Sequence, residues 1–162
     1  MALKQASRPV WPGAIIHSLR TAVAAVTSLL IARLMRLPAS YWAPITTLVI
    51  TQSSLGAALT VSRQRFVGTA LGALVGVAAS HFGARAPWFG ICIFLLGLLC
   101  AAVRTSWSAY RFGGITLAIV MLIPTDGPAW RVAFHRFAEV SVGIGVALLL
   151  AVVWPEGDAP PN

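Results

Sequence analysis

A carboxylate and two guanidinium groups stand inside apolar stretches of this sequence. Glu139 is the only acidic residue within a predicted helix, and Arg136 precedes it by three positions in the same stretch. An ionised group at the middle of a bilayer costs about 2.5 to 3.5 kcal/mol on insertion scales, so Glu139 should face protein and have a partner there. The candidate partners are Arg136 and Arg20, which lies in the first apolar stretch.

Two interpretations of these charged side chains stay open. In the first, Glu139 and an arginine form a buried ion pair that only positions helices. In the second, Glu139 takes up and releases a proton, while Arg20 or Arg136 holds either this carboxylate or an anionic substrate. Arginine suits the second role because its planar fork meets a carboxylate in two parallel hydrogen bonds.

Polar residues also interrupt the apolar stretch 42–61 near its middle, where Gln52 and Ser53 stand between Thr51 and Ser54. Pro44 removes a backbone donor and Gly56 loosens the helix on the other side. Two explanations stay open: hydrogen bonding between helices, and a broken helix that lines a substrate cavity. At the corresponding place in a later stretch, two glycines predict a second broken helix; they are Gly113 and Gly114.

The pattern contains no catalytic arrangement. Cys92 and Cys100 lie eight residues apart in one apolar stretch, about 12 Å along a helix, which is too far for a disulfide. The three histidines have no metal-ligand spacing, and no nucleophile motif, phosphate-binding loop or carboxylate pair occurs. We therefore expect no enzyme activity, no catalytic residue, no metal and no cofactor.

The elements that must position these groups are membrane helices. Hydrophobic residues make up 58% of the 162-residue chain and charged residues 10%, more apolar surface than a soluble domain of this size could bury. Apolar stretches run near 14–34, 42–61, 66–82, 88–103, 112–123 and 132–154. A crossing needs about 20 residues, or about 17 where the bilayer thins. We expect an all-α polytopic membrane protein with six transmembrane helices, five being the alternative.

This division gives an N-terminal tail at 1–13, a transmembrane domain at 14–154 and a short disordered tail at 155–162. The net charge of +8 comes from twelve Lys and Arg residues that lie mostly at helix ends. Such residues anchor helices to lipid head groups, so we expect a lipid bilayer and no nucleic acid as partner. Their distribution over the two membrane faces is nearly balanced, and it leans towards both termini in the cytoplasm.

The two halves of the chain echo each other. The segment 65–72, Arg-Phe-Val-Gly-Thr-Ala-Leu-Gly, returns at 136–143 as Arg-Phe-Ala-Glu-Val-Ser-Val-Gly. Three crossings per copy would invert the second copy relative to the first, which is a transporter layout. Repeat one then covers about 14–82 and repeat two about 88–154. Arg65 joins the ion-path candidates through this echo, and small residues at fourth positions predict helix packing at Gly68, Gly72, Gly76 and Gly143.

A resemblance to a known family rests on a combination of motifs in the two halves. Tyr-Trp-Ala-Pro at 41–44, Gln52, Leu-Gly at 55–56 and Arg65 with the following glycine stripe form the first part, and Arg136, Glu139, Gly143 and Trp-Pro at 154–155 the second. Over residues 15–155 the chain resembles the fusaric acid resistance and aromatic acid exporter family, a group that is similar to the aluminium-activated malate transporters. The resemblance implies export of aromatic or other organic carboxylates across an inner membrane, with proton-driven exchange and both termini cytoplasmic.

The chain departs from that family after the Trp-Pro motif. Members typically continue into a helical cytoplasmic domain, whereas seven residues follow here. We expect a homodimer or a pairing with another membrane module, because six helices of this size would hardly enclose a cavity. Two other functions stay open: a non-transporting membrane subunit or assembly partner, and a passive anion channel.

Ring recognition would require aromatic side chains near an arginine. The candidates are Trp42, Trp107, Tyr110 and Phe112. The same residues also suit an interfacial aromatic belt, so both interpretations stay open.

Overall fold

The computed structural model describes residues 10–51, 54–82, 86–124 and 127–154. These residues form six α-helices and one short 3-10 helix, with no strand among them. The elements are α1 (Val10–Leu34), α2 (Trp42–Ile50), α3 (Leu55–Ala79), η1 (Ser80–Phe82), α4 (Ala86–Ala102), α5 (Trp107–Leu122) and α6 (Ala129–Val153). The predicted all-α class and the number of helices are confirmed for this part of the chain.

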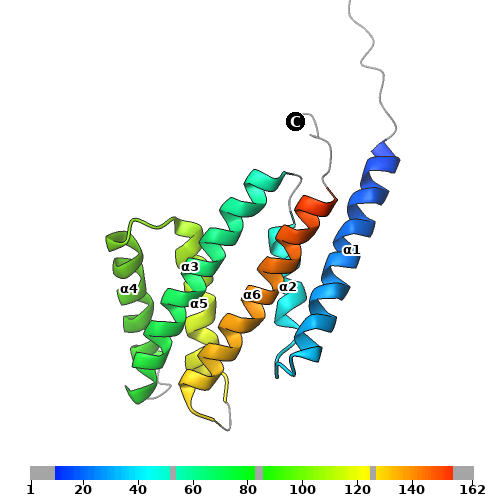
Figure 1. Cartoon of the computed structure of the whole chain (residues 1–162). Helices are drawn as coiled ribbons and strands as arrows, with labels where there is room; N and C mark the ends of the chain where they lie inside the picture. Colours follow the sequence, from blue (N-terminus) through cyan, green and yellow to red (C-terminus); the bar gives the residue numbers. More distant parts are fainter. Residues whose placement is uncertain (1–9, 52–53, 83–85, 125–126, 155–162) are drawn as a thin grey trace, which may run out of the picture.

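Successive helices run in opposite directions, so the start of α1 and the end of α6 lie at the same end of the bundle (Figure 1). The long helix α3 is central and packs against both α5 and α6. On one side α2 packs against α6 and is covered by α1, and on the other side α4 covers α5. The helices therefore form two flanks around a central pair, α3 and α6.

The outer surface of this bundle is apolar. Large hydrophobic side chains are more than half exposed on both flanks, including Leu19 and Val26 of α1 and Phe94 and Leu98 of α4. By length and composition, two helices of the described residues could cross a membrane, over Gly13–Leu34 and Ala129–Val153, and Pro87–Ala102 and Trp107–Leu122 are shorter apolar helices. A continuous apolar exterior of this kind suits contact with lipid rather than water.

The structure differs from the expected helix boundaries in the first half. The interruption after Ile50 separates α2 from α3, and α3 then runs without a break through Arg63 and Arg65. Those charges had suggested a boundary between the stretches 42–61 and 66–82. Arginine is a good helix former, and Arg65 is buried with partners on neighbouring helices, so its charge does not end the helix.

Gly113 and Gly114 do not break a helix either, since α5 is continuous from Trp107 to Leu122. Gly113 instead provides close packing. An added Cβ on Gly72 of α3 would collide with the backbone carbonyl of Gly113, and one on Gly68 would collide with that of Ala109. At these two positions the backbones of α3 and α5 approach as only glycine permits.

The first helix of each half ends in the same way. Arg36 after α1 and Arg104 after α4 both adopt the left-handed conformation, with φ of 55° and 54°. The next residue in each case, Leu37 or Thr105, donates its N–H to a carbonyl five residues back. This is the Schellman arrangement, which satisfies the last carbonyls of a helix and turns the chain sharply.

Candidate functional site

Arg65 lies near the middle of α3 and points into the bundle, where it is only 5% exposed. Its Nε donates a hydrogen bond of 3.2 Å to the hydroxyl of Thr46 on α2. Its guanidinium carbon lies 4.8 Å from the ring centre of Phe112 on α5. Residues on three helices therefore meet around one buried positive charge.

Arg136 and Glu139 form a second charged group on α6, where they are 3% and 1% exposed. One guanidinium nitrogen of Arg136 lies 3.7 Å from a carboxylate oxygen of Glu139. The other carboxylate oxygen accepts a hydrogen bond of 3.1 Å from the backbone N–H of Ala39, in the connection between α1 and α2. Glu139 thus ties that connection to α6, because its side chain bridges a cation and a backbone donor.

Arg136 also stacks on an aromatic ring. Its guanidinium carbon lies 3.7 Å from the ring centre of Trp42, the first residue of α2. Within the described part of the chain, its buried Nε has no hydrogen-bond acceptor, and its buried Nη1 has only the Glu139 oxygen at 3.7 Å, beyond hydrogen-bond distance. Because a ring covers only the face of a guanidinium, the N–H groups at its edge stay available for an acceptor in the same plane.

Arg65 on α3 and Arg136 on α6 lie at one level of the bundle, because the residues that follow them are in contact. The next residues, Phe66 and Phe137, pack ring against ring with centroids 4.8 Å apart and hold α3 against α6 at this level. Glu139 is the only acidic residue in the described ranges. The centre of the bundle is therefore rich in positive charge relative to its one carboxylate.

The remaining predicted site residues lie in different places. Arg20 is 3% exposed on α1, a helix that packs against α2 and α6. Gln52 and Ser53 lie outside the described residues. Pro44 lies in the first turn of α2, and Gly56 in the first turn of α3 has open space around it.

The predicted packing glycines face neighbouring helices. Besides Gly68 and Gly72 against α5, a Cβ on Gly76 would come within 3.0 Å of the Val120 side chain. On the other flank, a Cβ on Gly143 would lie 2.5 Å from the Ala43 carbonyl oxygen and 2.6 Å from Cβ of Thr46. The hydroxyl of Thr47 adds a hydrogen bond of 3.1 Å to the Gly143 carbonyl.

The aromatic candidates divide into two groups. Trp42 and Phe112 each lie against a buried arginine. Trp107 is 82% exposed and makes an edge contact with Tyr110. Trp107 therefore has the surface position of a belt residue, whereas Trp42 and Phe112 belong to the charged centre.

Sequence reasoning missed two contributors, Thr46 and the backbone N–H of Ala39. A signal for Thr46 existed, because it stands four residues after Trp42 on one face of α2, and the pair Phe112 and Thr116 repeats this spacing in α5. No sequence signal marks a backbone donor such as Ala39, since its role depends on the path of the connection. Within the described ranges, no cluster of three metal-ligating side chains occurs.

Known proteins similar to this chain include two inner membrane proteins and an uncharacterized transporter. The chain is 29% identical to the inner membrane protein YeeA of Escherichia coli K12 over 153 residues, which cover 88% of this chain and 41% of that protein. It is 26% identical to the uncharacterized transporter YdhK of the same organism over 156 residues, 88% of this chain and 23% of that protein. The inner membrane protein YccS of that strain is 22% identical over 141 residues.

The chain thus spans less than half the length of these relatives. Their names support a membrane location and a general transporter character for this chain. The model of the fusaric acid resistance protein-like family matches residues 24–150, a range that contains Arg65, Arg136 and Glu139. The chain therefore belongs to the fusaric acid resistance protein-like family.

Proposed function

We propose that this chain is a transporter module that exports aromatic or other organic carboxylate anions, with Arg65 and Arg136 as the groups that bind the carboxylate. The observation that carries the proposal is the burial of Arg65 and Arg136, while the described residues supply a single acid, Glu139, which pairs with Arg136. Excess positive charge in a protein interior is costly unless an anion compensates it. A substrate carboxylate would provide that compensation.

The geometry of Arg136 supports this role. Its buried Nε has no acceptor among the described residues and its Nη1 has only the Glu139 oxygen at 3.7 Å, while Trp42 covers the face of its guanidinium. A carboxylate in the guanidinium plane would accept two parallel hydrogen bonds. An aromatic acid would further gain from the rings of Trp42 and Phe112, because offset ring pairs attract one another.

Contacts that correspond between the two halves support a transport mechanism. Arg65 of the first half stacks on Phe112 of the second, and Arg136 of the second half stacks on Trp42 of the first. In the same way Gly72 meets Gly113 on α5, and Gly143 meets Ala43 on α2. Such paired contacts favour two related units of three helices in opposite orientation. Rocking of one unit against the other would expose the arginines first to one side and then to the other.

Glu139 is the proposed proton carrier of this cycle. It contacts both Arg136 and the N–H of Ala39, so a change in its protonation would alter a charge at the binding site and a contact of the α1–α2 connection together. A substrate anion at Arg136 would compete with the ionised carboxylate of Glu139, so substrate binding and the protonation of Glu139 would be linked. The proposal includes multi-pass insertion in the inner membrane with both termini cytoplasmic, and assembly as a homodimer or with another membrane module.

Vesicles test the proposal directly. The purified chain is reconstituted, and uptake of labelled hydroxybenzoate is compared with uptake of the neutral amide hydroxybenzamide. We expect saturable uptake of the acid only, reduced to background by Arg136→Gln but not by Arg131→Gln, an exposed arginine on the same helix. Equal uptake of acid by the parent and Arg136→Gln would contradict the role of Arg136. A linear current without dependence on a pH gradient would indicate a passive anion channel instead.

A further inference from the structure

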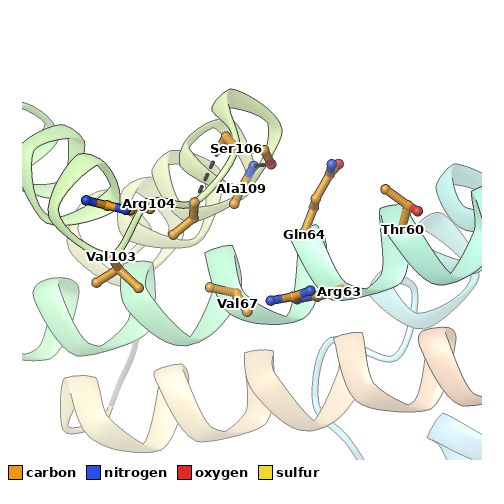
Figure 2. Close-up of a pocket in the computed structure, with 9 residues that line it drawn as sticks. Thr60, Arg63, Gln64, Val67, Val103, Arg104, Ser106 and Ala109 are labelled. Carbon is orange, nitrogen blue, oxygen red and sulfur yellow. Dashed lines mark hydrogen bonds between the residues drawn. The ribbon is translucent and has the colours of Figure 1, made fainter.

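A cleft lies away from the charged centre, at the end of the bundle where α1 begins and α6 ends. It has a volume of about 370 Å³ and is bordered by the first half of α3 and by the α4–α5 turn. Figure 2 shows Thr60, Arg63 and Gln64 on α3, with Arg104 and Ser106 on the turn. The cleft therefore combines two arginines with neutral polar groups.

The charged side chains that border this cleft are all positive. No acidic side chain is among the described residues that border it. Both arginines are exposed, so neither charge is neutralised by burial against a carboxylate. A cleft with two cations and several hydrogen-bond donors at a membrane surface is complementary to an anion.

The backbone conformation of the α4–α5 turn fixes the position of Arg104. Arg104 has a φ of 54°, a conformation that is uncommon for any residue other than glycine, and the Schellman bonds of α4 hold it there. Two residues later, Ser106 caps α5 by accepting a hydrogen bond of 3.3 Å from the N–H of Ala109. The start of α5 thus faces the same region, and its dipole adds to the positive potential.

An apolar groove adjoins the cleft. It has a volume of about 170 Å³, shares Thr105 and Ser106 with the cleft, and is otherwise bordered by Gly97, Cys100, Ala101, Trp107 and Tyr110. This groove lies along α4 and α5, next to side chains that face lipid, such as Leu98 at 53% exposure. A polar cationic cleft joined to an apolar groove fits a ligand with an anionic head and an apolar tail.

We propose that the cleft and groove together form a binding site for one anionic phospholipid, with the phosphate at Arg63 and Arg104 and an acyl chain along Trp107 and Tyr110. The site is independent of the proposed transport step, since none of its residues belongs to the charged centre. A transported aromatic acid fits less well because it has no apolar tail to fill the groove. The corresponding place on α6 lacks the first cation, since Phe134 occupies the position equivalent to Arg63.

Native mass spectrometry of the full chain in detergent, titrated with phosphatidylglycerol or phosphatidylcholine, tests this site. We expect one phosphatidylglycerol to be retained in preference to phosphatidylcholine. The double variant Arg63→Gln/Arg104→Gln should weaken phosphatidylglycerol binding about tenfold. Each single variant should have a smaller effect in the same direction. The single variants also provide the test if the double variant does not fold.

The matched control is Arg33→Gln/Arg36→Gln at the opposite end of the bundle. It also removes two exposed arginines, one of them in the same left-handed position after a helix. We expect its phosphatidylglycerol binding to match the parent. An equal loss in the control, or no preference for phosphatidylglycerol in the parent, would overturn the proposal. Displacement of the lipid by hydroxybenzoate would overturn it as well and would assign the cleft to a free carboxylate.

Discussion

The contact of α3 with α5 and the contact of α6 with α2 use corresponding positions, and one pair of residues, Gly68 and Glu139, gives them different chemistry. On the first, Gly68 lets the α5 backbone at Ala109 approach α3 so closely that a Cβ would collide with it. On the second, Glu139 occupies the position equivalent to Gly68 and reaches the N–H of Ala39, the counterpart of Ala109. In the second contact a carboxylate therefore fills the space that direct backbone packing occupies in the first.

This difference indicates different roles for the two helix contacts, which their glycine stripes alone would not distinguish. The α3–α5 contact is made by backbone against backbone, which gives it few ways to change. The α2–α6 contact depends at Glu139 on polar bonds, which protonation or an anion can exchange. We infer that α3 and α5 form a rigid pair, and that the nine-residue helix α2 is the element free to move.

The largest expected effect is on Glu139, because it is the polar bridge of the α2–α6 contact. Glu139→Gln keeps the shape and a hydrogen bond to Ala39 but removes the titratable charge. Uptake driven by a pH gradient should fall to the level of empty vesicles, while binding of hydroxybenzoate should persist. Transport by this variant that follows the pH gradient as in the parent would remove Glu139 as proton carrier.

The rigid α3–α5 contact should respond most to added volume. Gly72→Ala places a Cβ against the Gly113 backbone, and we expect a loss of about 3 kcal/mol in the free energy of unfolding in mixed micelles. Gly143→Ala should cost less, because the short helix α2 can shift. The control is Gly145→Ala, which has no atom within 4 Å of the new Cβ and should be neutral or stabilising. A larger loss for Gly143→Ala than for Gly72→Ala would reverse our assignment of the rigid pair.

Two corresponding threonines offer a smaller test of the polar centre. Thr46→Val removes the acceptor of the Arg65 Nε bond and should cost about 2 kcal/mol of unfolding free energy, since the donor is charged. Thr116→Val, its counterpart, removes only a bond of 3.2 Å to the Phe112 carbonyl of the same helix and should cost about 1 kcal/mol or less. Equal losses would show that the Arg65 bond contributes nothing specific.

The smallest effect should come from the stacked rings. Trp42→Leu removes the ring 3.7 Å from Arg136, and Phe112→Leu removes the ring 4.8 Å from Arg65. Trp42 lies closer to its arginine, and tryptophan attracts cations more strongly than phenylalanine does. We therefore expect Trp42→Leu to lower the free energy of unfolding by about 0.5 to 1 kcal/mol more than Phe112→Leu does. The measurement is the unfolding free energy of the two variants under the same conditions, and an equal or opposite ranking would contradict the stacking argument.

Much of this arrangement could be predicted from the sequence. The interruption within the stretch 42–61, the facing glycines and the proximity of Arg136 to Glu139 follow from local patterns, because turn residues and helical spacing determine them. The helix boundary expected near Arg63 and Arg65 was wrong. The sequence pattern could not show that Arg65 has Thr46 and Phe112 as partners inside the bundle. The bond from Ala39 to Glu139 joins residues 100 positions apart, and only the packing of α2 against α6 brings them together.

The central claim is that the buried arginines bind a carboxylate, and equilibrium binding tests it most directly. Calorimetric titration of the purified chain with hydroxybenzoate should show saturable binding that hydroxybenzamide lacks. Arg65→Gln and Arg136→Gln should each weaken it by at least about tenfold, the loss of one charge-assisted hydrogen-bonded contact. Arg131→Gln should leave it unchanged. Binding of the acid that persists in both Arg65→Gln and Arg136→Gln would contradict the account.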